Sequence, residues 1–355
     1  MLSGLPWDIR VAVWDRAFVG VRSWFRREGL KEVSTPVRVG APAIEPFIEP
    51  LAAPPGFLAT SPELSMKRLL CRGSGSIFQV AHVFRGAEVG RRHAEEFHMI
   101  EWYRVAAQGD ATAAFSAIRA DVEGLVESVR AEIEGLDLPR SLVQIPGQIA
   151  RWEEVDGPLH LAETLGVEPS RLNSGHAIAE ALVRLRAQCA VGDAEACSPL
   201  APVSDATVHL AQWTELFSLW SDGVFDPWLR EKAAKSTHPS ALHLIGFPAA
   251  LAALAEIREG VGMRFESYVG DLELANGYLE LRDPVEQHQR FVRANGLREM
   301  YGRTPLPLDR GFLADLGRGE GLPPSAGAAL GLERLLMHVC GSESIDDITL
   351  AVGGP

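Results

Sequence analysis

The segment from residue 60 to residue 104 limits the possible folds of this 355-residue chain more than any other stretch. A basic helical run at 66–70 precedes a first strand that ends at Phe84-Arg85, and a second strand over 96–103 is rich in aromatic residues. With the polar loop between them, these strands predict a β-hairpin. An arginine at a strand end, facing further cations of the loop, is a way to hold a triphosphate. For an isolated motif, an ordinary hairpin with a solvated loop is the simpler alternative.

The composition excludes several classes of protein. Apolar residues make up 46% of the chain, as in a globular protein of one large domain or two average ones. No apolar run approaches the roughly 18 residues of a membrane span, and no signal-peptide pattern opens the chain, so no membrane association is expected. Four cysteines without a CxxC pair predict reduced, mostly structural thiols and a cytoplasmic location.

The net charge of −13 argues against broad nucleic-acid binding, which requires many phosphate contacts. A local basic site is still expected in the first segment. Six cations fall between positions 67 and 92, namely Lys67, Arg68, Arg72, Arg85, Arg91 and Arg92.

A second block, residues 264–283, places Glu266, Glu273 and Glu280 seven residues apart. On a helix this spacing gives one solvated acidic face, whereas on strands the side chains change face. The aromatic and β-branched residues of the block favour strands, and the Asn276-Gly277 step disfavours a helix. We therefore predict two strands joined by a turn near Gly270-Asp271, which can bring separated carboxylates to one site.

A third block, GAALGLERLLM at 327–337, reads as a glycine-rich strand followed by a helix that Arg334 opens. Such a strand admits a nucleotide close to the backbone. Alone this pattern is weak evidence for a nucleotide site. It gains weight because it follows the other two blocks in the chain.

Together the three blocks resemble the class II aminoacyl-tRNA synthetases of the lysyl branch. The first block has the motif 2 run TSPE, MKRLL, GSG, IFQ, FR, a loop histidine and EWY, and the others resemble the ELANG block and motif 3. Within that branch the chain is most similar to the truncated lysyl-synthetase paralogues that attach β-lysine to elongation factor P. The resemblance implies an α+β fold, a class II aminoacyl-tRNA synthetase catalytic domain with an antiparallel sheet flanked by helices.

The resemblance also organises the rest of the chain, which we expect to be a single domain over 1–355. A helix at 8–27 and the segment 32–37 resemble motif 1, which builds the homodimer interface of these enzymes; a helix followed by an edge strand is an equal alternative. We expect a loop at 40–58, a surface helix at 110–136, a helical insertion at approximately 150–235, and strands again from 241. Only about seven residues precede the first helix, so no N-terminal anticodon-binding domain and no strong tRNA binding are expected.

The implied reaction is amino-acid activation, in which a carboxylate attacks the α-phosphate of ATP with the help of Mg²⁺. By resemblance, Arg85 holds the α-phosphate and the amino-acid carboxylate, while Arg334 and His93 contact the distal phosphates. The resemblance further implies that Phe97 stacks on adenine, with Leu274 and Gly331 also beside the nucleotide, and that Glu266 and Glu273 hold Mg²⁺. It assigns the amino acid's amino and carboxylate groups to Ser61, Pro62, Glu63 and Tyr103, its ε-ammonium to Glu280, and the size of the pocket to Ala329. The implied substrates are lysine or β-lysine, with elongation factor P as acceptor.

Two departures from the family pattern keep alternatives open. Ala87 replaces the glutamate that usually follows the motif 2 arginine by two places, and Ala94 replaces an asparagine after the loop histidine. On a strand, Glu88 is expected to point the opposite way from position 87. Besides the leading hypothesis we therefore retain activation for another acceptor (a small molecule, a carrier protein or a lipid) and a catalytically impaired paralogue that binds a ligand and regulates a partner.

Overall fold

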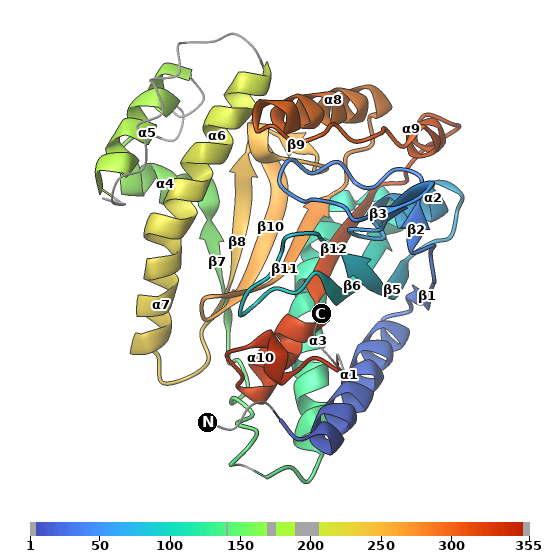
Figure 1. Ribbon diagram of the computed structural model, residues 1–355, viewed down its shortest axis with the longest axis vertical. Coiled ribbons are helices and arrows are strands. Elements are labelled where there is room, and N and C mark those ends of the chain that lie inside the picture. Colours follow the sequence, from blue (N-terminus) through green and yellow to red (C-terminus); the bar gives the residue numbers. More distant parts are fainter. Residues whose placement is uncertain (1–4, 140, 169–174, 189–205, 351–355) are drawn as a thin grey trace.

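A nine-stranded sheet forms the centre of the molecule (Figure 1) in the part of the chain that the structure describes, residues 5–139, 141–168, 175–188 and 206–350. In this computed structural model the strand order is β1-β5-β6-β12-β11-β10-β8-β7, and β9 pairs with β10. The pairs β1-β5 and β7-β8 are parallel and the others antiparallel, which confirms the predicted sheet. The strands are β1 Lys31–Glu32, β5 Ile77–Phe84, β6 Glu96–Val105, β7 Trp152–Asp156, β8 Ala241–Pro248, β9 Ile257–Arg258, β10 Val261–Val269, β11 Leu272–Leu279 and β12 Ser325–Gly331.

Helices cover this sheet on both faces and at its ends (Figure 1). They are α1 Trp7–Arg27, α2 Glu63–Cys71, α3 Ala111–Glu134, α4 Gly157–Leu165, α5 Gly175–Gln188, α6 Ala206–Trp220, α7 Asp226–Lys235, α8 Pro284–Met300, α9 Arg310–Leu316 and α10 Leu332–Cys340. The predicted helix at 8–27 is therefore confirmed as α1, and the predicted helix after the glycine-rich strand as α10.

The side chains of β6 alternate between two environments, because successive residues of a strand point to opposite faces. The ring of Trp102 is buried 5.4 Å from Phe25 of α1, and its indole N–H donates to Asp121 of α3 at 3.0 Å. Glu101 and Tyr103 lie on the other face, where they are also buried but hydrogen-bond to each other. One strand thus contributes to the hydrophobic core and to a polar site.

The predicted surface helix at 110–136 is present as α3, with one exposed and one buried face. The buried face packs against α1 and the sheet, and Ile118, Val122 and Leu125 on it have no exposed surface. The predicted loop at 40–58 is only partly a loop, because the short strands β3 Ala52–Ala53 and β4 Gly56–Leu58 form a small sheet with β2 Arg38–Val39.

The predicted helical insertion at 150–235 is only partly helical. Helices α4 to α7 gather beside β8 (Figure 1) and form a separate hydrophobic cluster that includes Trp213, Leu216, Trp220 and Phe225. The insertion also contains β7, which extends the central sheet at its edge. The stretches 169–174 and 189–205, with Cys189 and Cys197, lie outside the described residues.

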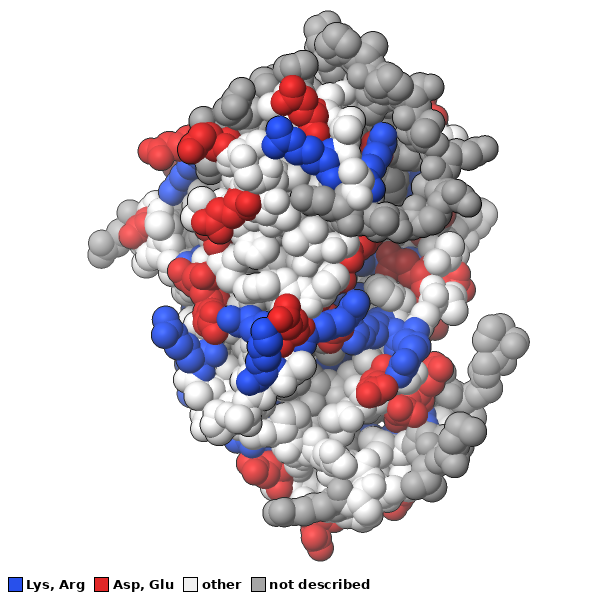
Figure 2. Space-filling view, turned by 90° about the vertical axis from the view of Figure 1, so that its left-hand side faces the viewer, with Lys and Arg blue, Asp and Glu red and all other residues white. Residues whose placement is uncertain are grey.

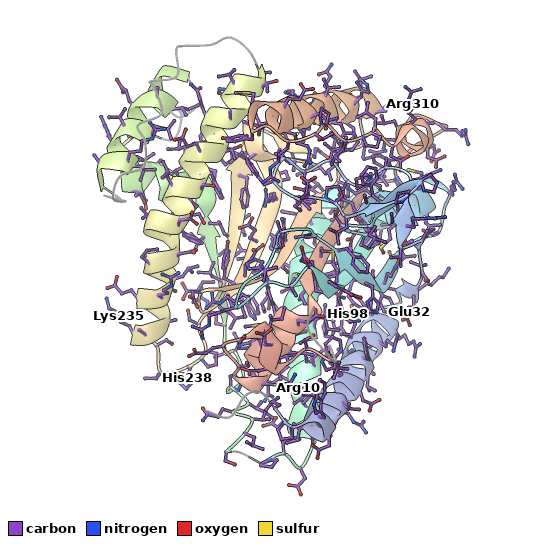
Figure 3. All side chains as sticks on the ribbon, in the orientation of Figure 1. Arg10, Glu32, His98, Lys235, His238 and Arg310 are labelled. Atoms are coloured by element: carbon purple, nitrogen blue, oxygen red, sulfur yellow. The ribbon has the colours of Figure 1, made fainter. Side chains whose placement is uncertain are left out.

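Turns and end contacts complete the frame of the site. Gly270 has φ +60° in the turn between β10 and β11, so the predicted pair of strands is confirmed. Arg10 (Figure 3) connects α1 to the last described segment by donating to the carbonyls of Asp346 and Thr349.

Cys71 and Cys340 are free thiols. Among the described helices, none has the length and apolar character needed to cross a membrane.

Candidate active site

A cavity of about 270 Å³ opens where the β5–β6 hairpin, β11, β12 and the start of α10 meet. Its walls carry the cations expected for a triphosphate together with backbone from the glycine-rich strand. Predicted site residues that line it are Arg85, His93, Phe97, Glu273, Leu274, Ala329, Gly331 and Arg334, and Ala94 lines it as well. The structure therefore brings the residues predicted to contact the nucleotide to one place.

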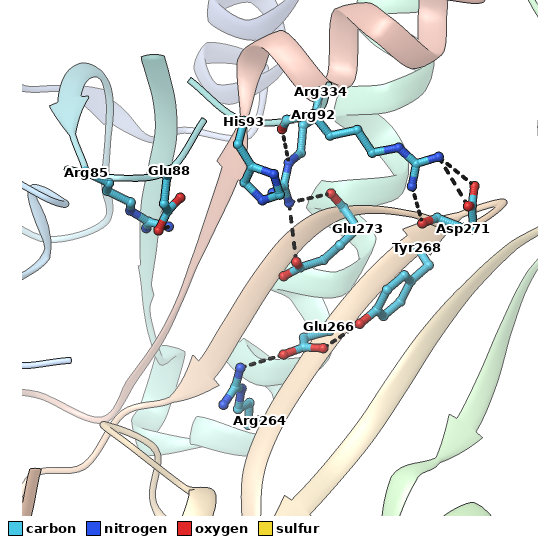
Figure 4. Close-up of polar contacts among 10 residues, drawn as sticks. All are labelled: Arg85, Glu88, Arg92, His93, Arg264, Glu266, Tyr268, Asp271, Glu273 and Arg334. Carbon is cyan, nitrogen blue, oxygen red and sulfur yellow. Dashed lines mark hydrogen bonds and ion pairs between the residues drawn. The ribbon is translucent and has the colours of Figure 1, made fainter. Parts of the chain in front are cut away.

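Arg334 connects the two sides of this cavity (Figure 4). Its guanidinium donates to the Glu273 carbonyl at 3.1 Å and the Glu273 carboxylate at 3.3 Å, and lies 2.7 Å from His93 Nε2. Burial and the charge of Arg334 lower the pKa of His93, so the imidazole is neutral and its Nε2 can accept a hydrogen bond. Arg334, His93 and Glu273 therefore form a polar wall of the cavity before any ligand binds.

Arg85 lies at the end of β5 and is held by its neighbours. Its Nε donates to the Thr60 carbonyl at 3.3 Å, and its guanidinium lies 5.3 Å from the centre of the Phe97 ring. The predicted stacking partner of adenine thus already has a cation on one face. Arg85 also forms a 3.9 Å ion pair with Glu88 (Figure 4).

The expectation that Glu88 points away from the site is wrong. The chain has left β5 at Phe84, and Ala87 adopts φ +63°, so the alternation of a strand no longer applies. As a result Glu88 lines the nucleotide cavity. The Ala87 amide instead donates to the Glu95 carboxylate at 2.9 Å, which stabilises this turn.

A second set of contacts fixes the loop that carries His93. The guanidinium of Arg92 forms an ion pair with Asp271 at 3.1 Å, and Arg230 of α7 binds the same carboxylate at 3.1 Å. At the other side of the loop, Arg91 pairs with the exposed Glu343 at 2.7 Å. The hairpin loop is therefore connected to the β10–β11 turn and to the helical insertion.

Next to the cavity, three buried glutamates surround one buried lysine. Lys67 Nζ lies 2.6 Å from Glu63 and 2.5 Å from Glu280, with only 1% of its side chain exposed. Glu101 accepts a 2.6 Å hydrogen bond from the Tyr103 hydroxyl and lies close enough to be influenced by the charges of Glu63 and Lys67. We call Lys67, Glu63, Glu101 and Glu280 the acidic subsite.

The acidic subsite holds more carboxylates than its one ammonium neutralises. Burial and repulsion by Glu63 raise the pKa of Glu101 to about 8, and burial raises the pKa of Glu280 to about 7, against the attraction of Lys67. Lys67 remains protonated, because Glu280 and Glu63 hold its pKa above the usual value in spite of burial. The subsite therefore favours the arrival of a further positive group.

Glu280, assigned by resemblance to the substrate's ε-ammonium, already has a cationic partner in the protein. Lys67 Nζ lies 2.5 Å from one Glu280 oxygen, which this ion pair occupies. The other oxygen, Oε1, has no hydrogen-bond partner among the described residues and retains capacity for an ammonium ligand.

Sequence reasoning missed Glu101. A signal was available: Glu101 and Tyr103 are two apart on a strand and so share a face, and Tyr103 was already assigned to the substrate. Ser61 links this residue to the predicted turn, because its hydroxyl donates to Glu101 at 2.8 Å and accepts from the Glu63 amide at 2.9 Å. Pro62 precedes α2 and positions Glu63 as its first residue.

Gly327 gives the acidic subsite its depth. A β-carbon at this position of β12 would lie 2.3 Å from the Tyr103 ring and 2.7 Å from Glu280, so any side chain would displace both. Ala329, two residues on, pairs in register with Glu101 and lines the nucleotide cavity. Gly327 thus lies at the acidic subsite and Ala329 at the nucleotide cavity, two residues apart on one face of β12, and the role of Ala329 in sizing the pocket stays a prediction.

The predicted Mg²⁺ ligands differ in their availability. Glu273 faces the cavity and is 38% exposed, whereas Glu266 is buried against Arg264 (2.5 Å) and the Tyr268 hydroxyl (2.7 Å). No group of three or more candidate ligand side chains is found among the described residues. The donor set fits a cation that also takes oxygens from phosphates, as Mg²⁺ does when it neutralises a bound triphosphate. The role of Glu266 stays a prediction.

Comparison with known proteins identifies the family. Residues 11–351 match the sequence profile described as tRNA synthetases class II (D, K and N). The chain belongs to this family. Its relatives include three proteins named elongation factor P–(R)-β-lysine ligase. The one from Histophilus somni strain 2336 is 34% identical over 92% of this chain and 90% of the relative, and the one from Vibrio vulnificus strain YJ016 is 32% identical over 93% of this chain and 91% of the relative. The protein from Pectobacterium atrosepticum is 34% identical over 92% of this chain and 90% of the relative. The resemblance and the fold class inferred from the three sequence blocks are confirmed.

Proposed function

We propose that this class II synthetase is an ATP-dependent ligase that activates lysine or β-lysine as an adenylate and transfers it to a lysine of elongation factor P. The observation that carries this proposal is the acidic subsite, where Glu101 and Glu280 lie buried beside a cavity lined by arginines. A substrate with a distal ammonium stabilises the ionised form of these carboxylates and pairs with it, whereas a neutral amino acid offers them no charged partner.

The nucleotide end of the site supports activation with ATP. Arg85 and Arg334 offer guanidinium groups to phosphate oxygens, and neutral His93 lies between the loop and α10. Positioning and charge neutralisation provide most of the catalysis in phosphoryl chemistry, so these residues suffice without a nucleophile of the protein. Glu88 supplies a carboxylate in the cavity although position 87 is alanine. This argues against a catalytically impaired paralogue.

The choice of acceptor rests on the relatives, which are named for elongation factor P. The charge of the chain agrees with a protein acceptor rather than a long nucleic acid, since its net charge is −13. Figure 2 shows one face of the molecule on which Lys and Arg are interspersed with Asp and Glu instead of forming a broad basic surface. We further propose a cytoplasmic homodimer.

The test is ATP–pyrophosphate exchange over a panel of amino acids, followed by mass spectrometry of elongation factor P after incubation with the preferred one. Lysine or (R)-β-lysine should be activated. Norleucine, which keeps the α-ammonium but lacks the distal ε-ammonium, should not be activated. Exchange of a neutral amino acid in preference to both would contradict the proposal. Unmodified elongation factor P in the presence of active exchange would leave activation intact and overturn the acceptor.

A further inference from the structure

A pair of histidines lies on the hairpin of β5 and β6, apart from the residues assigned to the substrates. His82 and His98 are directly opposite each other in the strand register, so their side chains project from the same face of the sheet. Their Nε2 atoms are 3.0 Å apart, and their ring centres are 4.0 Å apart. Neither histidine lines the nucleotide cavity, so the proposed function does not account for the pair.

A carboxylate lies at the other nitrogen of each ring. His98 Nδ1 is 2.8 Å from Glu333 of α10, and His82 Nδ1 is 3.4 Å from Glu96. An ionised carboxylate only accepts hydrogen bonds, so it favours the tautomer in which Nδ1 carries the proton. In both rings the Nε2 atom then has a lone pair and no proton.

These two lone pairs are close enough to repel each other. At 3.0 Å, two ring nitrogens form a favourable contact only when one of them donates a proton or when both bind the same cation. The shared cation is either a proton, which makes one ring a histidinium, or a metal ion. The arrangement of the carboxylates decides in favour of the metal ion as the occupant that suits both rings equally.

The chemistry of the pair fits a transition-metal ion. Neutral imidazole is a ligand of Zn²⁺ and Cu²⁺, and metal–nitrogen distances in zinc sites are about 2.0–2.1 Å. Two nitrogens 3.0 Å apart can both reach that distance from one ion that lies beside the line between them. A carboxylate at the far nitrogen is the usual support of a metal-binding histidine, because it fixes the ring and raises its basicity.

The pair is held in place and is open to solvent. The ring of His98 (Figure 3) packs against Trp14 and Phe18 of α1, with ring centres 4.8 and 6.3 Å away. Its backbone amide also donates to Glu333 at 2.9 Å. His82 has 54% of its side chain exposed, so an ion can arrive from solvent. No group of three or more ligand side chains is found among the residues that the structure describes, so water would complete the coordination.

We propose that His82 and His98 form a binding site for a divalent transition-metal ion such as Zn²⁺ or Cu²⁺, separate from the Mg²⁺ proposed at the triphosphate. The two Nε2 atoms are the protein ligands, and Glu96 and Glu333 orient the rings. Mg²⁺ does not compete for this site, because it prefers oxygen ligands. The bound ion connects β5 to β6 at the outer part of the hairpin.

The experiment titrates the full chain with Zn²⁺ by calorimetry, without nucleotide and with Mg²⁺ in excess, and records the electron paramagnetic resonance spectrum of bound Cu²⁺. Wild type should bind about one Zn²⁺ per chain at this site, and the Cu²⁺ spectrum should show both nitrogen ligands. His82→Ala should weaken Zn²⁺ binding by about a hundredfold and remove one nitrogen from the spectrum. Glu96→Gln, which removes only the support of His82, should weaken Zn²⁺ binding by about tenfold.

His288→Ala is the matched control, because His288 is an exposed histidine of α8, outside the hairpin. It should leave Zn²⁺ binding and the Cu²⁺ spectrum unchanged, and circular dichroism checks that each variant is folded. Zn²⁺ binding that is as tight in His82→Ala as in wild type would place the ion elsewhere and overturn the inference. A wild-type Kd above about 1 mM would also overturn it, because the two histidines would then share only a proton.

Discussion

Single residues of the acidic subsite couple ligand binding to the release of a proton. Glu101 is 2% exposed and has a pKa of about 8, so at neutral pH most of this carboxyl is protonated without a ligand. An arriving ammonium favours the ionised form and therefore displaces a proton. Because the folded-state pKa lies above the unfolded value, Glu101 stabilises the ligand-free protein at low pH, and this contribution is lost as pH rises from about 4.5 towards 8.

We predict that lysine binding at pH 7 releases about one proton and tightens as pH rises from 6 to 8. Calorimetry in buffers of different ionisation enthalpy measures the proton count directly. Glu101→Gln should remove most of the release, leaving the smaller part from Glu280, and weaken lysine by about 2–3 kcal/mol, because a neutral amide replaces the ionised partner. Binding that is independent of pH in wild type would show that Glu101 is already ionised or does not face the ligand.

The structure also changes the role expected for Glu88, which was predicted to point away from the site. Because it lines the nucleotide cavity beside Arg85, Glu88→Gln should raise the KM for ATP about fivefold with little effect on kcat, as expected for an interaction of equal strength in ground and transition states. Glu96→Gln is the control, since Glu96 is exposed on the same hairpin and pairs with His82. An equal change in both variants would attribute the effect to the hairpin and not to the nucleotide.

At the scale of elements, residue chemistry predicted the hairpin, the β10–β11 pair and the β12–α10 junction, because each combines strand-forming residues with a turn or a glycine-rich run. It could not predict the ion pair between Lys67 and Glu280, because these residues are distant in sequence and meet only through the folded sheet. It also failed at Glu88, since strand alternation was extended past a left-handed residue, Ala87. Ala87 already bears the cost of that conformation, about 1 kcal/mol, because the clash arises from its β-carbon, so a glutamate introduced at 87 would inherit the same strain.

The loop between β5 and β6 should depend on Asp271, which binds Arg92 and Arg230. We predict that Asp271→Asn loosens this loop, raises the KM for ATP about three- to tenfold and speeds tryptic cleavage after Arg91 or Arg92. Glu343→Gln, which removes the exposed partner of Arg91, should do neither, because exposed ion pairs contribute little. Identical behaviour of the two variants would show that Asp271 does not position the loop.

At the scale of the whole molecule, exposed large apolar side chains gather mainly on α8 and α1, and α1 is the one that resembles part of a dimerising motif. Trp7, Val11 and Val19 are 49%, 56% and 37% exposed on the helix that resembles part of motif 1, and Val37 is 44% exposed just beyond β1. The opposite side of the helix is already buried against α3 and the sheet. Exposed apolar side chains gathered on one element are typical of a surface that another chain covers.

We therefore predict that wild type is a dimer through α1 and that Val11→Lys dissociates it, since a lysine in an apolar interface leaves a buried charge without a partner. Sedimentation velocity at micromolar concentration measures the change, and circular dichroism checks that the variant is folded. Val285→Lys is the control: Val285 is 64% exposed on α8, outside the proposed interface, and its replacement should leave the dimer intact. A monomeric wild type would overturn the proposed dimer. A dimer that survives Val11→Lys would place the interface away from α1, because a C2 contact brings the same substitution in from both subunits.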